Sequence, residues 1–152
     1  MFYLVAYALM TLTAFAVVLC VANTSGSDEI TAFEGLSQRS PFLAAALFIA
    51  LLSLAGVPPL IGFFGKLWLL LAAVQQGLLW LVVIGAVNVV ISLYYYLLVV
   101  KRMYMHPPQG AASVSVSPLM QLTIVACLAG ILVLGVYQRP LVLFALHSTR
   151  GF

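Results

Sequence analysis

Lys66 is the residue whose type and position could do chemistry in this sequence, because it is the only formally charged side chain between Phe42 and Val100. A charge at bilayer depth costs about 2.5 to 3.5 kcal/mol on insertion scales, so an intramembrane lysine requires an explanation. Burial disfavours the ammonium form, which lets such a lysine gain and lose a proton. One interpretation is therefore a proton relay. The other is an anchor whose long stem carries the ammonium to a membrane interface.

A predicted break in the chain precedes this lysine. Pro58 and Pro59 remove backbone donors, and the residue before a proline is pushed out of the helical region. Carbonyls that lose their partners at membrane depth need water or neighbouring helices, and discontinuous helices are a usual setting for ion sites. Gly62 and Gly65 allow a close approach between helices. An anchoring lysine needs none of these features, so they favour the relay and leave the anchor open.

A polar face follows in the next apolar run, where four residues recur at spacings of three or four: Gly85, Asn88, Ser92 and Tyr96. Such spacings place side chains on one face of a helix, with Tyr95 beside it. This face could carry a chain of hydroxyls and waters to or from Lys66. Alternatively, it makes interhelical hydrogen bonds, worth roughly 0.6 to 2 kcal/mol in membranes, and the tyrosines at 94–96 form an aromatic belt.

The remaining reactive residue types predict no second site. The two cysteines lie in apolar runs without metal-ligand spacing, and no Gly-rich phosphate loop, Ser/His/Asp set or pair of carboxylates in a span occurs. We expect His106 and His147 to be ordinary surface residues, and Glu29 and Glu34 to be solvated loop residues. The sequence therefore predicts no metal site and no cofactor bound by this chain.

Composition decides where these residues lie. Of 152 residues, 65% are hydrophobic, and only six Lys or Arg and three Asp or Glu carry a full charge, too few to cover a water-soluble surface. Apolar runs of 18 residues or more indicate membrane spans, so the lipid bilayer is the expected solvent. The basic residues are scattered, whereas a nucleic-acid surface needs them clustered. A nucleic-acid partner is therefore excluded.

The apolar runs predict an all-α membrane protein of about four transmembrane helices, organised as one bundle over residues 1–152. The predicted spans cover residues 2–22, 41–74, 78–100 and 119–138. A continuous helix over the second run would be about 51 Å long, well beyond a hydrocarbon core of about 30 Å, so this span must be discontinuous at Pro58–Pro59. If it crosses once, the loops at 23–40 and 101–118 lie on the same side of the membrane.

Three segments together resemble a known family: YLVAYALMTLTAFAVV at residues 3–18, SLAGVPPLIGFFGKLWLL at 53–70 and VIGAVNVVISLYYYL at 83–97. They are similar to the C-terminal part of the N subunits of bacterial NADH:quinone oxidoreductase, respiratory complex I, which are equivalent to mitochondrial subunit 2. These are antiporter-like membrane subunits. The middle segment is shared with related subunits and with cation/proton antiporter complexes, so the subunit assignment depends mainly on the other two.

This resemblance implies a multi-pass subunit of the membrane arm in a bacterial inner membrane, where proton transport is coupled to quinone reduction elsewhere in the complex. The whole complex uses NADH and quinone, and other membrane-arm subunits would be partners. Lys66 matches the family's lysine in the GFFGK-type motif, and Pro58 and Pro59 match the break of its helix. Two alternatives stay open: a subunit of a cation/proton antiporter complex, and a non-catalytic membrane scaffold.

The main departure from the family is one of extent. A full member has a long preceding part that contains the first inverted repeat, with its glutamate and lysine relay residues, and the start of the second. That N-terminal part would be a further partner of these residues. We therefore expect this chain to supply one station of a proton path and not a complete pump, whether it is a truncated product, one piece of a split subunit or a fragment.

Overall fold

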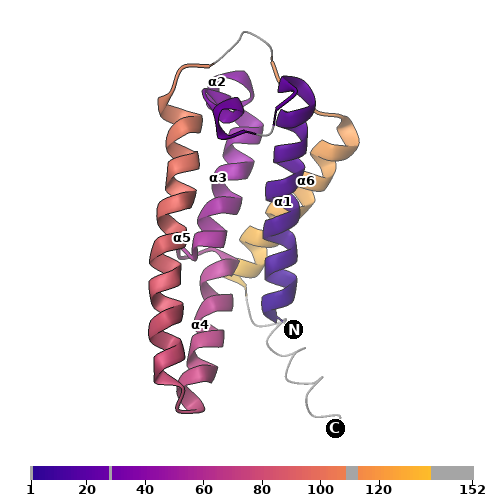
Figure 1. Ribbon diagram of the computed structural model, residues 1–152. Coiled ribbons are helices and arrows are strands. Elements are labelled where there is room, and N and C mark those ends of the chain that lie inside the picture. Colours follow the sequence, from indigo (N-terminus) through magenta and orange to yellow (C-terminus); the bar gives the residue numbers. More distant parts are fainter. Residues whose placement is uncertain (1, 28, 109–112, 138–152) are drawn as a thin grey trace.

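The computed structural model describes residues 2–27, 29–108 and 113–137, and these residues form helices and connecting segments without a strand (Figure 1). The elements are α1 (Phe2–Ser25), the 3₁₀ helix η1 (Ile30–Phe33), α2 (Leu36–Arg39), α3 (Pro41–Ala55), α4 (Ile61–Gln75), α5 (Leu79–Met105) and α6 (Pro118–Val136). The predicted all-α class is confirmed.

Four passes emerge from these helices. In the described part of the chain, α1, α5 and α6 are each long and apolar enough to cross a membrane. The helices α3 and α4 have 15 residues each, fewer than the roughly 20 that a span needs, and they lie end to end (Figure 1). Together they form the discontinuous second span, as predicted. Gln138, the last residue of the predicted fourth span, and the tail that follows it lie outside the described residues.

The arrangement is a bundle in which α1 contacts α3, α4 and α6, while α5 runs alongside α3 and α4 on the other side. Helix α6 passes obliquely behind α1 and approaches the junction of α3 and α4 (Figure 1). At the end of the bundle where α3 begins, the backbone N–H of Gly35 donates to the carbonyl of Arg102 at 3.3 Å. The loops that follow α1 and α5 therefore share one end of the bundle, which agrees with the predicted topology.

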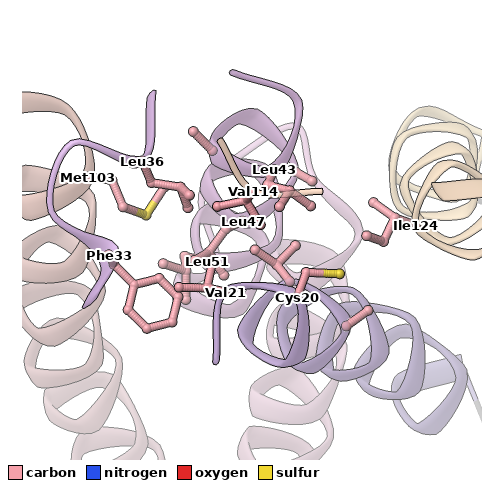
Figure 2. Close-up of a cluster of buried hydrophobic side chains, with 14 residues drawn as sticks. Cys20, Val21, Phe33, Leu36, Leu43, Leu47, Leu51, Met103, Val114 and Ile124 are labelled. Carbon is pink, nitrogen blue, oxygen red and sulfur yellow. The ribbon is translucent and has the colours of Figure 1, made fainter. Parts of the chain in front are cut away.

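Most of the buried side chains gather near that shared end. Figure 2 shows this cluster, in which residues from six elements and the segment before α6 meet; its largest members include Phe33, Leu36, Leu43, Met103 and Ile124. By contrast, little of α4 and α5 is buried. Helix α5 has one buried residue, Met103 near its C-terminal end, and the buried residues of α4 are confined to its first turns. Apolar side chains can face lipid without loss, so the α4–α5 hairpin needs no such core.

The expectation that Glu34 is a solvated loop residue is wrong. The residue is only 8% exposed, and Arg102 donates to its Oε1 at 2.7 Å. Gly35, with φ of 64°, turns the chain beside it, and both η1 and α2 contact α5. The burial is tolerated because the carboxylate has a paired guanidinium. Glu29 is exposed, as expected.

The histidines and cysteines give a mixed outcome. His106, expected at the surface, is half-buried, and its Nδ1 has no hydrogen-bond partner in the described part of the chain. His147 lies outside the described residues. Cys20 and Cys127 are buried free thiols. Their burial agrees with a packing role.

Candidate functional site

The end of α3 has an ordered set of hydrogen bonds. The last four carbonyls of an α-helix have no partner within the helix. Gly56, with φ of 90° and ψ of 40°, donates to Ser53 O at 3.0 Å, and Val57 donates to Leu52 O at 3.0 Å. This is the Schellman pattern that a left-handed glycine permits. It satisfies the carbonyls of Leu52 and Ser53 and leaves those of Leu54 and Ala55.

Lys66 supplies the two missing donors. Its ammonium reaches back across the break, and Nζ lies 2.7 Å from Leu54 O and 3.2 Å from Ala55 O. The side chain is half-buried, and its stem runs beside Gly56, where a Cβ would lie 3.2 Å from Lys66 Cδ. The negative end of the α3 dipole also favours a cation at this position. The ammonium is therefore held at the break by backbone oxygens.

No carboxylate in the described part of the chain lies within ion-pair distance of Lys66. The positive charge is instead stabilised by the dipoles of the Leu54 and Ala55 carbonyls. In transporters, backbone carbonyls and helix C-termini at discontinuous membrane helices coordinate the transported cations. Such a setting holds the ammonium without fixing it in a permanent salt bridge.

The break itself consists of residues 56–60. The Pro58–Pro59 peptide bond is cis, and both prolines are exposed. On the side of α6, Gly135 packs so closely that a Cβ there would lie 2.7 Å from the carbonyl oxygen of Pro59 and 2.9 Å from the nitrogen of Ile61. Helix α6 therefore abuts the backbone of the break.

The start of α4 is joined to α3 by a second close contact. Gly62 is buried, and a Cβ on it would collide with the carbonyl oxygen of Ser53. Its N–H donates to Ser53 Oγ at 3.2 Å. Gly65, one turn into the helix, is also buried. The two glycines thus lie on the closely packed part of α4, at the level of the break.

A cleft of about 390 Å³ opens beside Lys66, between α1, α4 and α5. Of the polar face anticipated on α5, Asn88, Ser92 and Tyr96 line this cleft together with Gly85. Ser92 Oγ donates to Asn88 O at 2.7 Å, within its own helix. The structure therefore brings Lys66 and most of the predicted polar path to one cavity.

Tyr95 lies apart from this group. It is 61% exposed and makes an edge-to-face contact with Tyr94, at 5.8 Å between ring centroids. Neighbouring residues on a helix point about 100° apart, so Tyr95 and Tyr96 cannot both face the cleft. The exposed pair of Tyr94 and Tyr95 favours the interpretation of these two tyrosines as part of an aromatic belt.

Three cleft or break residues were not anticipated from the sequence. Tyr3 and Tyr7 of α1 line the cleft opposite α5, with their rings stacked at 6.0 Å. Their spacing of four residues was an available signal, because it places both rings on one helical face. Ser53 gave no comparable signal, since a single serine in an apolar run has many ordinary explanations.

A second cavity, of about 470 Å³, lies between α4 and α5 and shares Leu69, Leu70, Gly85 and Asn88 with the cleft. Its lining is mostly aliphatic. Among the described residues, no group of three His, Cys, Asp or Glu side chains is placed to hold a metal ion. The chemistry that the site can perform is therefore binding and transfer of a proton at Lys66 Nζ, with hydroxyls, an amide and space for water nearby.

The known proteins that this chain resembles include subunits N of NADH-quinone oxidoreductase. The family model for the transmembrane region of NADH:quinone oxidoreductase and Mrp antiporters matches residues 1–92. NADH-quinone oxidoreductase subunit N of Moorella thermoacetica is 39% identical over all of this chain, which covers 32% of that relative. The Desulfitobacterium hafniense subunit N is 44% identical over 99% of this chain and 30% of its own length.

A solved structure has the same fold. It is that of respiratory complex I from Thermus thermophilus with bound aureothin, in which one chain matches with a TM-score of 0.76 and 31% sequence identity. The match covers 89% of this chain and 31% of that chain. This chain thus spans about a third of the length of the relatives it matches.

Proposed function

The chain belongs to the NADH:quinone oxidoreductase/Mrp antiporter transmembrane family, and from this premise we propose that it forms the Lys66 station of a proton path in the membrane arm of NADH:quinone oxidoreductase. The observation that carries the proposal is the ammonium of Lys66 on the carbonyls of Leu54 and Ala55, beside a cleft with polar side chains. Relatives described as subunit N support this enzyme over an antiporter.

The proposed step is a reversible proton transfer at Lys66 Nζ. In the protonated state, the ammonium is stabilised by the two carbonyls and the α3 dipole. On release, an N–H bond of Nζ breaks and an O–H bond forms on water in the cleft, from which Asn88, Ser92 and Tyr96 offer hydrogen-bonding groups for onward transfer. Uptake of a proton from the other side restores the ammonium. This chain binds neither NADH nor quinone in the proposal, and the complex supplies that chemistry elsewhere.

The proposed setting follows from the same family membership. The partners are the lipid bilayer, other membrane-arm subunits and the part of the subunit that corresponds to the remaining length of the relatives. The proposed location is a bacterial inner membrane, because the relatives described as subunit N are bacterial proteins.

The strongest alternative is a scaffold in which Lys66 only caps α3. The two hydrogen bonds to Leu54 and Ala55 would satisfy backbone carbonyls in either case. What separates the two functions is proton release. Arginine keeps a cation and several N–H donors but does not deprotonate in proteins, so it can cap the helix without acting as a relay.

The test uses the assembled complex in proteoliposomes, with NADH oxidation and proton uptake measured together. Lys66→Ala and Lys66→Arg should both lower proton transport per assembled complex, whereas a scaffold predicts wild-type transport for any Lys66→Arg complex that assembles. Unaltered transport in both variants would defeat the relay. Replacing quinone reduction by a sodium gradient as the driving force tests the antiporter alternative, which predicts that transport persists.

A further inference from the structure

Ser53 connects three helices through one hydroxyl group. Its side chain lies in the last turn of α3 and is fully buried. The hydroxyl donates to Met10 Sδ of α1 at 2.9 Å and accepts the N–H of Gly62 of α4 at 3.2 Å. Methionine sulfur is a weak acceptor, so the bond from Gly62 is the stronger of the two.

We infer that Ser53 is a positioning residue for Lys66, whose hydroxyl sets the offset between α3 and α4 and so keeps the ammonium on its two carbonyls. This inference rests on the proposed function, because it gives Ser53 a role in transport only through Lys66. It assigns no proton transfer to Ser53 itself.

The positions of the partners support this role. Gly62 and Lys66 are four residues apart and lie on one face of α4. Their partners, Ser53, Leu54 and Ala55, are consecutive residues of α3. The two half-helices are therefore joined by adjacent contacts, one made by the hydroxyl and one by the ammonium.

The Gly62 contact also completes the N-terminus of α4. The first N–H groups of a helix lack partners within it, and the residue before α4, Leu60, has no side-chain acceptor. Ser53 Oγ supplies that acceptor from the preceding half-helix, as an N-cap serine would from its own chain position. Gly62 permits α4 to approach α3 closely, and the hydrogen bond fixes the position of one half-helix relative to the other.

Loss of the hydroxyl should therefore displace the ammonium. Without Ser53 Oγ, the Gly62 N–H has no acceptor in a buried place, and α4 can slide or rotate relative to α3. Proton transfer depends steeply on donor and acceptor positions, and a misplacement of about 1 Å can lower a rate by about 10²-fold. A buried serine with a purely structural role would instead lower the amount of assembled complex and leave the transport properties of each complex unchanged.

Thr13 offers a matched control. It is also a fully buried hydroxyl residue of a membrane helix, but its Oγ1 donates to Leu9 O at 2.8 Å within α1. It does not line the cleft. Thr13→Val therefore removes a buried hydroxyl without altering a contact between half-helices.

The experiment compares Ser53→Ala, Thr13→Val, Lys66→Ala and the Ser53→Ala/Lys66→Ala double variant in the assembled complex. Proton transport per complex and its pH profile are measured in proteoliposomes. Ser53→Ala should lower transport by about fivefold, the population change expected for one lost hydrogen bond, and displace the pH profile. Thr13→Val should keep both at wild-type values. In the Lys66→Ala background, Ser53→Ala should cause no further loss.

Two results would overturn the inference: wild-type rate and pH profile in Ser53→Ala, or an additional loss in the double variant. Either result leaves the relay intact if Lys66→Ala alone lowers transport, whereas wild-type transport in Lys66→Ala defeats the proposed function first. If Ser53→Ala does not assemble, Ser53→Cys serves instead, because a thiol is a weaker acceptor of similar shape. Its transport should lie below wild type, and a wild-type rate and profile would again overturn the inference.

Discussion

Gly62→Ala is the substitution that tests the geometry of the break most directly. An added Cβ would collide with the carbonyl oxygen of Ser53 and would lie 2.7 Å from its carbonyl carbon and 2.9 Å from Met10 Sδ. Carbon–carbon contacts are ordinarily about 3.5 to 4.0 Å, and the oxygen contact is the shortest of the three, so α4 must move away from α3 by at least about 1 Å. Backbone atoms form the obstacle, and a rotamer change cannot relieve it.

That displacement has two consequences. Overpacking of this kind costs about 1 to 3 kcal/mol of stability. It also lengthens the Gly62 N–H to Ser53 Oγ bond and the Lys66 Nζ contacts, which are 3.2 Å or shorter. We expect proton transport per assembled complex to fall by about 10²-fold, because transfer is sensitive to shifts of this size.

The assay measures the amount of assembled complex, its thermal unfolding and its proton uptake during NADH oxidation in proteoliposomes. Gly130→Ala is the control, since a Cβ there would lie 3.0 Å from Leu9 Cδ1, the mobile end of a side chain that can rotate away. It should assemble and transport as wild type. Assembled Gly62→Ala complexes with wild-type transport would refute the link between the spacing of the half-helices and the function of Lys66.

Two further predictions concern the polar residues at the cleft and at the loop end. Tyr96→Phe should lower proton transport by about threefold to tenfold, because Tyr96 lines the cleft and one hydrogen bond is worth about 1 kcal/mol. Tyr95→Phe should leave transport unchanged, because Tyr95 is exposed and does not line the cleft. Equal effects of the two variants in the same proteoliposome assay would remove Tyr96 from the path. Glu34→Ala should lower the stability of the assembled complex by about 0.5 to 1.5 kcal/mol in a thermal unfolding measurement, because it removes the carboxylate that pairs with Arg102, whose side chain is 41% exposed and can bind water instead. Glu29→Ala, at an exposed position, should have no measurable effect, and an equal loss of stability in both variants would contradict the structural role of the Glu34–Arg102 pair.

The sequence predicts the spans and the break because both follow from strong one-dimensional signals. A run of 34 mostly apolar residues exceeds one bilayer thickness, and two consecutive prolines interrupt a helix wherever they occur. The predicted bounds differ from the observed ones by a few residues, mainly where α1 and α5 continue beyond the apolar run into polar residues. Hydrogen bonding within a helix does not stop where hydropathy does.

Contacts between segments far apart in sequence could not be predicted in this way. Glu34 lies in a polar stretch, and nothing in that stretch indicates that Arg102, 68 residues away, closes over it. Tyr95 and Tyr96 are chemically identical neighbours, and only the rotation of α5 against α1 and α4 decides which one faces the cleft. The sequence restricts such residues to a face, and the packing of other helices selects among them.

The carbonyls at the end of α3 explain why a cap and a relay can be the same residue. Gly56 and Val57 satisfy the carbonyls of Ser53 and Leu52, so the remaining two require a donor that is not part of the local backbone. A permanently charged donor would satisfy them but could not pass a proton onward, and an uncharged hydroxyl would satisfy only one. A lysine at this position satisfies both carbonyls when protonated and weakens its hold when it releases the proton. Deprotonation of Lys66 should therefore loosen the junction of α3 and α4, which couples the charge of the site to the geometry of the break.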